Sequence, residues 1–88
     1  MFRMWCKLFK DNHLLKDTVI VVTDYTMSRT DKVFHCVSEA CIQFDLSQPI
    51  WLSSNIREFQ RHNKTRFYQD NFVEEISFDY LEVHIIEE

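Results

Sequence analysis

Residues 2–9 read Phe-Arg-Met-Trp-Cys-Lys-Leu-Phe, and this stretch decides how the fold begins. Apolar residues occupy every second position, at Phe2, Met4, Cys6 and Leu8. Basic and aromatic residues fill the positions between them. Because successive side chains of a strand point to opposite faces of a sheet, this alternation predicts a β-strand with one face on the core.

A second strand is predicted from the next apolar segment. Residues 10–13 are typical of a turn, and residues 15–23 then carry a run of β-branched side chains, Thr18, Val19, Ile20, Val21 and Val22. Such residues favour strands because they pack well on a pleated surface. The two strands are therefore expected to pair as an antiparallel hairpin, and the composition of the second suits a strand covered on both faces.

The turns of this chain must form without glycine, which is absent from all 88 positions. Glycine normally supplies the backbone conformations with positive φ that tight turns require. Asparagine and aspartate tolerate that conformation best among the other residues. We therefore expect positive φ at Asn12, Asn63 and Asn71.

The clearest helix is predicted over about residues 29–44. Ser28 and Asp31 have the spacing of a capping box, with aspartate in place of the more usual glutamate. Helical periodicity places one apolar stripe along the segment, formed by Val33, Val37, Ala40, Cys41 and Phe44. A shorter helix is predicted over about residues 55–63, with Asn55 as its N-cap. Residues 64–74 carry no pattern that assigns them.

The last stretch, residues 75–87, is strand-like, but its alternation slips near Tyr80. Ile76 and Phe78 have the parity of Tyr80, whereas Leu81, Val83 and Ile85 have the opposite parity. A one-residue slip moves side chains to the other face, so a β-bulge near Tyr80 would keep both halves buried. The alternative is a strand that is apolar on both faces and is covered by a partner or a second copy.

The predicted elements follow the order β-β-α-α-β. A three- to four-stranded antiparallel sheet with one main amphipathic helix packed on one face fits this order best, which makes the fold α+β. Residues 1–88 contain no linker, repeat or low-complexity stretch, so a single domain is expected.

The composition excludes several classes of protein. Phosphate-binding loops, dinucleotide fingerprints and nucleophile elbows all require glycine, which this chain lacks. The longest apolar run, Val19–Val22, is far shorter than the roughly 20 residues of a membrane-spanning helix. No apolar segment follows Arg3 and Lys7 as it does in a secretory signal. Three cysteines without a CxxC motif are typical of reduced thiols, so we expect a cytoplasmic protein without membrane contact.

Metal-binding and catalytic sites are not indicated by the spacing of the candidate side chains. The chain has four histidines and the cysteines Cys6, Cys36 and Cys41, but no pair has the spacing that brings two ligands onto one ion. Cys36 and Cys41 belong near the apolar stripe, where a thiol is inert. Glu82 and His84 share one face of the last strand as an acid–base pair, although such pairs commonly face solvent. We therefore expect no metal, no cofactor and no catalysis.

Four of the ten lysines and arginines are concentrated in residues 57–66. With the aromatic residues that follow, they form a candidate patch for phosphate or nucleic acid, Arg57, Arg61, Lys64, Arg66, Phe67 and Tyr68. Basic side chains beside aromatic rings can serve phosphate contact and base stacking. The net charge of −4 and the lack of lysine and arginine in residues 70–88 argue against this function. A solvated helix face is the simpler interpretation.

Acidic residues dominate the end of the chain. Glu75, Asp79 and Glu82 form a candidate acidic strand that a basic partner would recognise. The simpler interpretation is that acids on a sheet edge discourage edge-to-edge aggregation. A positive patch beside a negative strand also permits head-to-tail or two-fold self-association.

Five stretches carry a resemblance to known sequences. They read Phe-Arg-Met-Trp-Cys-Lys from residue 2, Lys-Asp-Thr-Val-Ile from residue 16, Pro-Ile-Trp-Leu from residue 49, Arg-Phe-Tyr-Gln-Asp-Asn-Phe from residue 66 and Phe-Asp-Tyr-Leu-Glu from residue 78. Through them the whole chain resembles a small family of uncharacterised proteins of clostridial gut bacteria. The resemblance implies a bacterial cytoplasmic setting and supplies no functional residues.

Two functions from different classes are compatible with these observations. The favoured one is a small non-catalytic module that binds another protein, or itself as a homodimer, through a sheet or helix surface. A variant is a phage-style inhibitor whose acidic strand occupies the nucleic-acid-binding groove of a host protein. The alternative is phosphate or nucleic-acid binding through residues 57–68.

Overall fold

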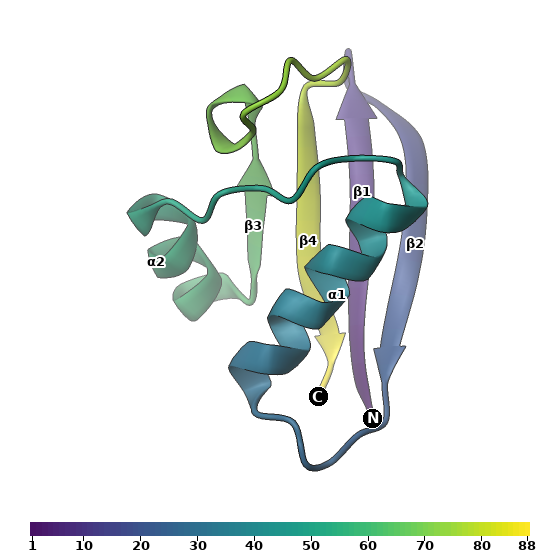
Figure 1. Cartoon of the computed structure of the whole chain (residues 1–88), viewed down its shortest axis with the longest axis vertical. Helices are drawn as coiled ribbons and strands as arrows, with labels where there is room; N and C mark the ends of the chain where they lie inside the picture. Colours follow the sequence, from purple (N-terminus) through teal and green to yellow (C-terminus); the bar gives the residue numbers. More distant parts are fainter.

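The computed structural model describes residues 1–88 and consists of a four-stranded sheet with two α-helices (Figure 1). The elements are β1 (Phe2–Lys10), β2 (His13–Val22), α1 (Arg29–Gln43), α2 (Ser53–His62), β3 (Lys64–Phe67) and β4 (Tyr80–Glu87), with a 3₁₀ helix at Gln69–Asn71. The strand order is β2-β1-β4-β3, and all neighbours are antiparallel. The predicted α+β fold is confirmed, with the larger of the two expected strand numbers.

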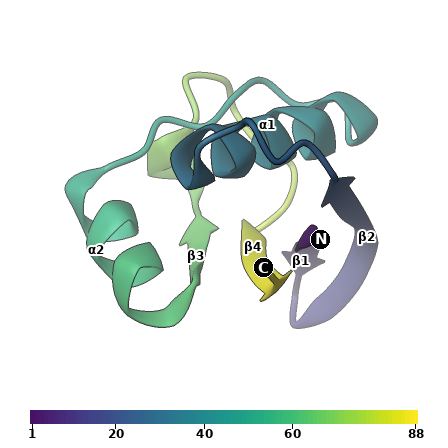
Figure 2. The same ribbon diagram turned by 90° about the horizontal axis from the view of Figure 1, so that it is seen from below.

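The two faces of the sheet have different surroundings. α1 lies across one face, over β1 and β2, whereas no helix covers the other face (Figure 2). α2 lies beside β3, at the opposite edge of the sheet from β2 (Figure 1). Neither helix has the length and apolar character that crossing a membrane requires. We call the side with α1 the helix face and the other side the open face.

The core lies between α1 and the helix face. Met4 and Cys6, from the alternating residues at the start of the chain, are fully buried there. Leu81 and Val83 of β4 lie beside them, because opposite residues of paired strands share a face. The apolar stripe predicted for α1 completes this core, and all of its members are buried: Val33, Val37, Ala40, Cys41 and Phe44. The period of two in β1 and the helical period in α1 thus predict correctly which side of each element faces the core.

Positive φ occurs at Asp11, Asn12, Asp45 and Asn63. Asp11 and Asn12 form the two-residue turn between β1 and β2, with φ of 52° and 65°. The type I′ turn, which is one of the two preferred turns of this length, needs positive φ at both central residues, so the pair suits the position. Asn63 ends α2 in the left-handed conformation. The predictions for Asn12 and Asn63 are confirmed, and the one for Asn71 is wrong because Asn71 lies in the 3₁₀ helix.

The two helix starts differ in how well the sequence predicts them. Ser28 caps α1, and its Oγ accepts a hydrogen bond from the N–H of Asp31 at 3.1 Å. α2 begins at Ser53, earlier than predicted, so Asn55 is not its N-cap. Asn55 lies in the first turn, where its Oδ1 accepts a hydrogen bond from the N–H of Leu52 at 3.1 Å. Its side chain therefore still satisfies a free backbone donor at the helix start.

β4 begins at Tyr80, later than the sequence predicts, and the β-bulge expected there is wrong. Residues 81–85 of β4 alternate regularly, and the pairing irregularity of this strand lies at its far end, where Ile86 is an extra residue opposite Arg3 and Met4. Ile76 and Phe78 precede the strand in an irregular segment, where side chains are not bound to a period of two. This irregular segment, not a bulge, explains the change of parity.

β3 lies within the segment that the sequence leaves unassigned. It is four residues long and pairs with β4 at the edge of the sheet. Thr65 and Phe67 are buried on the helix face, and Lys64 and Arg66 alternate with them toward the open face. This alternation determines where the basic residues of the segment are placed.

Candidate functional site

Three charged residues on the open face form an ion-pair triad. Glu82 lies between Lys7 and Arg66, with its carboxylate oxygens 3.0 Å from Lys7 Nζ and 3.1 Å from Arg66 Nε. The strand register places Glu82 directly opposite both partners. Beside this triad, Nε1 of Trp5 donates a hydrogen bond to Oδ2 of Asp17 at 2.9 Å. These contacts link polar groups of the open face across the four strands.

An aromatic row crosses the open face next to the triad. Phe9 and Tyr80 stack with ring centroids 5.1 Å apart, and the Tyr68 ring lies 5.4 Å from that of Tyr80. The guanidinium of Arg66 lies 4.6 Å from the centre of the Tyr80 ring, within the range of a cation–π contact. These rings contact each other and Arg66. The row is therefore a poor platform for nucleobases, which need free ring faces.

Glu82 and His84, the acid–base pair considered from the sequence, share the open face. Burial disfavours the charged form of Glu82, but hydrogen bonds from Lys7 and Arg66 outweigh it and hold its pKa below the usual range. Both carboxylate oxygens thus have cationic partners. Burial lowers the pKa of His84, and the charges of Lys64 and Lys7 lower it further. The arrangement is that of an ion-pair network, not of a catalytic dyad.

The three cysteines are free thiols buried in the core. Burial raises the pKa of Cys6 to about 12 and the pKa values of Cys36 and Cys41 to about 11. A thiol with so high a pKa carries almost no thiolate near neutral pH, and the thiolate is the reactive form. No group of three or more histidine, cysteine, aspartate or glutamate side chains is arranged to hold a metal ion. The thiols act as small apolar core residues.

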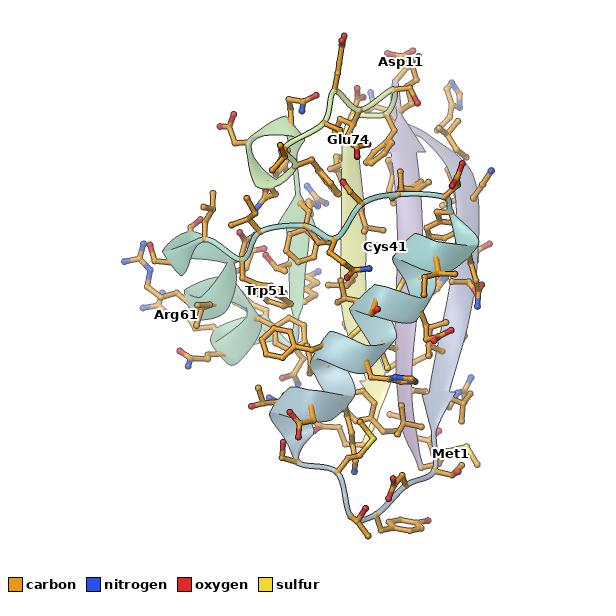
Figure 3. The ribbon with its side chains drawn as sticks, in the orientation of Figure 1. Met1, Asp11, Cys41, Trp51, Arg61 and Glu74 are labelled. Carbon is orange, nitrogen blue, oxygen red and sulfur yellow. The ribbon has the colours of Figure 1, made fainter.

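The predicted basic patch is divided between two surfaces. Arg57 and Arg61 are exposed on α2 (Arg61 is labelled in Figure 3). Asn63 ends this helix in the left-handed conformation and turns the chain into β3. Lys64 and Arg66 therefore lie on β3 with their side chains on the open face, and not on the helix that carries Arg57 and Arg61. The expectation that Lys64 shares a helix face with Arg57 and Arg61 is wrong, because α2 ends at His62.

The two aromatic residues of the predicted patch also separate. Phe67 is 0% exposed on the helix face, with its ring centroid 5.0 Å from that of Trp51, so it cannot stack on a nucleobase. Tyr68 is half exposed and tilts against Tyr80 at the edge of the open face. Successive side chains of an extended chain point to opposite sides, which is why those of Phe67 and Tyr68 lie on different faces of the sheet. The two aromatic rings expected to stack on nucleobases therefore do not lie together on one surface.

The predicted acidic strand is also not formed. Glu75 and Asp79 precede β4, in the segment that joins it to the 3₁₀ helix. Asp79 Oδ2 accepts a hydrogen bond from the N–H of Asp11 at 2.8 Å, which ties this segment to the hairpin turn. Glu82 is buried in the ion-pair triad on β4, an inner strand of the sheet. The inhibitor hypothesis therefore lacks the exposed acidic strand that it requires.

A buried amide network closes the β3 edge of the sheet. Nδ2 of Asn55 donates hydrogen bonds to Oγ1 of Thr65 and to the backbone carbonyl of Arg66, both at 2.9 Å. Nδ2 of Asn71 donates in turn to Oδ1 of Asn55 at 2.7 Å. The network lines a polar groove of about 420 Å³ between α2 and β3. One backbone carbonyl of β3, that of Arg66, is thus bonded to α2, and α2 packs beside this strand.

β2 forms the other edge of the sheet and has no strand on its outer side. It is ten residues long. Four of its apolar side chains are between 40% and 50% exposed: Leu14, Leu15, Val19 and Val21. The β-branched run predicts the strand but not this exposure, because the same composition suits a strand covered on both faces.

An apolar groove of about 180 Å³ lies between α1 and α2. Its apolar lining comes from both helices and from the segment that joins them, namely Val33, Phe34, Trp51, Ile56 and Phe59. Trp51 makes edge-to-face contacts with Phe34 and Phe59, at centroid distances of 5.8 and 5.6 Å, and Figure 3 shows it between the two helices. The sequence does not reveal this groove, because it depends on how closely α2 approaches α1.

The chain matches no protein-family model, no curated protein and no solved structure. The resemblance to a clostridial protein family therefore stays a prediction. A function for this chain has to be inferred from its own surfaces, foremost the β2 edge and the apolar groove between α1 and α2.

Proposed function

We propose that the protein is a small non-catalytic interaction module that binds another protein chain, a second copy of itself included, by adding a strand to β2. The contrast between the two edges of the sheet carries this proposal. β3 is short, lies beside α2 and has its Arg66 carbonyl bonded to that helix, whereas β2 is long and has no strand on its outer side. A partner strand therefore finds a free row of backbone groups at β2.

The backbone of β2 supplies the affinity in this mode of binding. An edge strand presents unpaired N–H and C=O groups, which an extended segment of another chain can bond as a new strand. β2 has ten residues, against a usual strand length of about five or six. The extra residue at Leu15 interrupts the regular pairing with β1, so the regular part of the edge is residues 16–22, along which several main-chain hydrogen bonds can form.

The side chains of β2 supply the selectivity. Val19 and Val21 point to the open face, opposite Trp5 and Arg3 of β1. They are 40% and 48% exposed, and apolar residues on a long free edge promote association. An added strand with apolar residues on the same side would cover both valines, whereas a strand with charged residues there would be rejected.

The placement of the candidate catalytic groups supports a non-catalytic function. Glu82 is held between two cationic side chains on the open face. The three thiols are buried, and burial raises their pKa values. These groups stabilise the fold, and none of them lines the β2 edge.

Affinity purification with the full chain as bait, from the cells that produce it, tests the proposal together with sedimentation velocity of the pure protein. The variant Val19→Lys/Val21→Lys places charge along the free edge, which opposes strand addition. We expect it to lose the bound chains, or the self-association, that the wild-type chain shows. The matched control is Val73→Lys, which changes a valine that is 86% exposed outside the sheet and should retain them.

Amide hydrogen exchange provides a second readout, since binding should give new protection that is confined to β2. Circular dichroism of both variants establishes that the fold is kept. Full retention of partners by the β2 variant would show that association does not use this edge. A wild-type chain that neither captures a partner nor associates with itself would equally contradict the proposal.

A further inference from the structure

β2 is the last strand on one side of the sheet, and its outer edge is seen at the right of Figure 1. We propose that two copies of this chain pair through β2, antiparallel, about a two-fold axis that passes between their Ile20 residues. This pairing rests on the proposed strand addition at β2 and names the partner as a second copy. The result is one continuous sheet of eight strands, four from each copy.

The backbone pattern of the sheet shows which residues of β2 have outward N–H and C=O groups. The N–H of Ile85 donates to the carbonyl of Asn63 at 2.8 Å, so odd-numbered residues of β4 bond toward β3 and even-numbered ones toward β1. Carried through the two registers of β1, this alternation leaves the even-numbered residues of β2 bonded to β1. The odd-numbered residues Asp17, Val19 and Val21 therefore direct their backbone groups outward.

The side chains of β2 restrict which residues of two copies can lie opposite each other. Opposite residues of paired strands share a face of the sheet, so each residue of β2 can meet only a residue of the same parity. Asp17, Val19 and Val21 all point to the open face. The pairing is therefore defined by which residue lies on the two-fold axis.

An axis at Ile20 matches the side chains on both faces. Val19 of each copy then lies opposite Val21 of the other, so four valines form one cluster on the open face. On the helix face, Ile20 meets its own copy and Thr18 lies opposite Val22. β-branched side chains thus oppose one another throughout, and such cross-strand pairs stabilise antiparallel sheets.

Other positions of the axis match the side chains less well. An axis at Thr18 or Val19 would place the carboxylate of Asp17 opposite a valine of the second copy. An axis at Asp17 would bring two carboxylates together, which is destabilising. An axis at Val21 would leave Val19 opposite Thr23, beyond the end of β2.

The two copies also supply each other's counter-charges. Continued past Val22, the register about Ile20 brings Lys16 of each copy opposite Asp24 of the other. Both residues are exposed, and neither takes part in an ion pair within the chain. Oδ1 of Asp24 accepts hydrogen bonds from the N–H and Oγ1 of Thr26, at 2.8 and 2.6 Å, which leaves Oδ2 free. By symmetry two ion pairs form, one at each end of the interface.

A two-fold pair also removes the free edge of the sheet. A long apolar edge strand promotes continued association with further chains. Pairing uses β2 of both copies and leaves the two β3 strands outermost, which are short and lie beside α2. Because the same surface of each copy meets the other, assembly stops at two chains.

Disulfide cross-linking tests the register. Opposite residues that exchange hydrogen bonds have Cα atoms about 5.5 Å apart, within disulfide range, whereas diagonal neighbours are about 7–8 Å apart. We therefore expect oxidised glutathione to link chains with Val19→Cys to chains with Val21→Cys, and to link either variant alone several-fold less. An affinity tag on one variant identifies the mixed product. Val73→Cys, outside the sheet, measures random collision, and the buried native thiols should not react.

Charge reversal tests the ion pairs. Lys16→Glu should raise the dissociation constant of the dimer by about tenfold, because two attractions become repulsions, and Lys16→Glu/Asp24→Lys should largely restore it. Lys10→Glu makes the same change of net charge at the hairpin turn and should have no effect. Sedimentation velocity over a series of protein concentrations measures each constant, and circular dichroism checks folding. Equal constants for Lys16→Glu and Lys10→Glu would contradict the register.

The remaining outcomes separate this pairing from the proposed function. A wild-type chain that stays monomeric but captures another protein, and loses it in Val19→Lys/Val21→Lys, overturns the two-fold pairing and leaves strand addition at β2 intact. Cross-linking of either cysteine variant alone as strongly as the mixture overturns the axis at Ile20. Self-association that persists in Val19→Lys/Val21→Lys overturns both, since it would not use this edge.

Discussion

Oε2 of Glu82 lies 3.0 Å from Nζ of Lys7, and the two side chains are only 9% and 14% exposed although no helix covers their face of the sheet. Arg66 completes the triad from the other side of Glu82. The triad and the aromatic row beside it together cover the centre of the open face. Removal of one member of such a pair leaves the other ion partly buried without its counter-charge.

Glu82→Gln should lower the free energy of unfolding by about 1–3 kcal/mol, because Lys7 keeps its charge and loses its partner. Denaturant unfolding at neutral pH measures this change. The matched control is Glu87→Gln, which removes the exposed ion pair with Arg3 at 3.3 Å. An exposed pair contributes less than about 1 kcal/mol, so the control should be nearly as stable as the wild type. Equal losses in the two variants would contradict the structural role of the triad.

The triad also predicts how stability depends on pH. The pKa of Glu82 is lower in the folded chain than in the unfolded one. Its stabilising contribution is therefore complete above the unfolded pKa and is lost as pH falls through the folded pKa. We expect wild-type stability to fall below about pH 4.5, and Glu82→Gln to show a shallower decline over the same interval. Unfolding curves over a series of acidic pH values test this, and identical slopes would count against it.

The hairpin and α1 could be predicted from sequence because each repeats its pattern over many residues. β3 could not, since four residues offer two inward positions and one of them is the polar Thr65. The stability of β3 comes from elements distant in the chain, through pairing with β4 and the hydrogen bond from Asn55. Local periodicity carries no information about such partners.

The candidate sites show the same limit. The sequence assigns Lys7 and Glu82 to the faces of their strands, but only the register of β1 against β4 brings them together. Phe34 and Ile56 likewise belong to two helices, and the groove exists because those helices approach each other. Local pattern predicts the face of an element, whereas a site depends on the distance between elements.

The three thiols should be almost inert in the folded protein. Burial raises the pKa of Cys6 to about 12 and the values of Cys36 and Cys41 to about 11, so little thiolate is present even at mildly alkaline pH. A chromogenic disulfide reagent should therefore titrate three thiols only after denaturant is added. Val73→Cys adds an exposed thiol as an internal control that should react at once in the folded state. Rapid reaction of a native thiol would mean that it is accessible.

Phe67 and Tyr68 are neighbours whose substitution should have very different effects. Phe67→Ala removes a fully buried ring that packs against Trp51, and should lower the free energy of unfolding by about 3–5 kcal/mol. Tyr68→Ala removes a half-exposed ring and should lower it by about 1 kcal/mol. Denaturant unfolding followed by tryptophan fluorescence measures both, and Phe67→Leu serves as the milder variant where alanine prevents folding.

The order of these two effects tests the parity of β3. Because strand residues alternate between faces, Phe67 on the helix face requires Arg66 on the open face, where it pairs with Glu82. A larger loss at Tyr68 than at Phe67 would mean that the strand runs with the opposite parity. Arg66 would then point into the core, the triad would lack its third member, and the chain would have three arginines without an ion-pair partner instead of two.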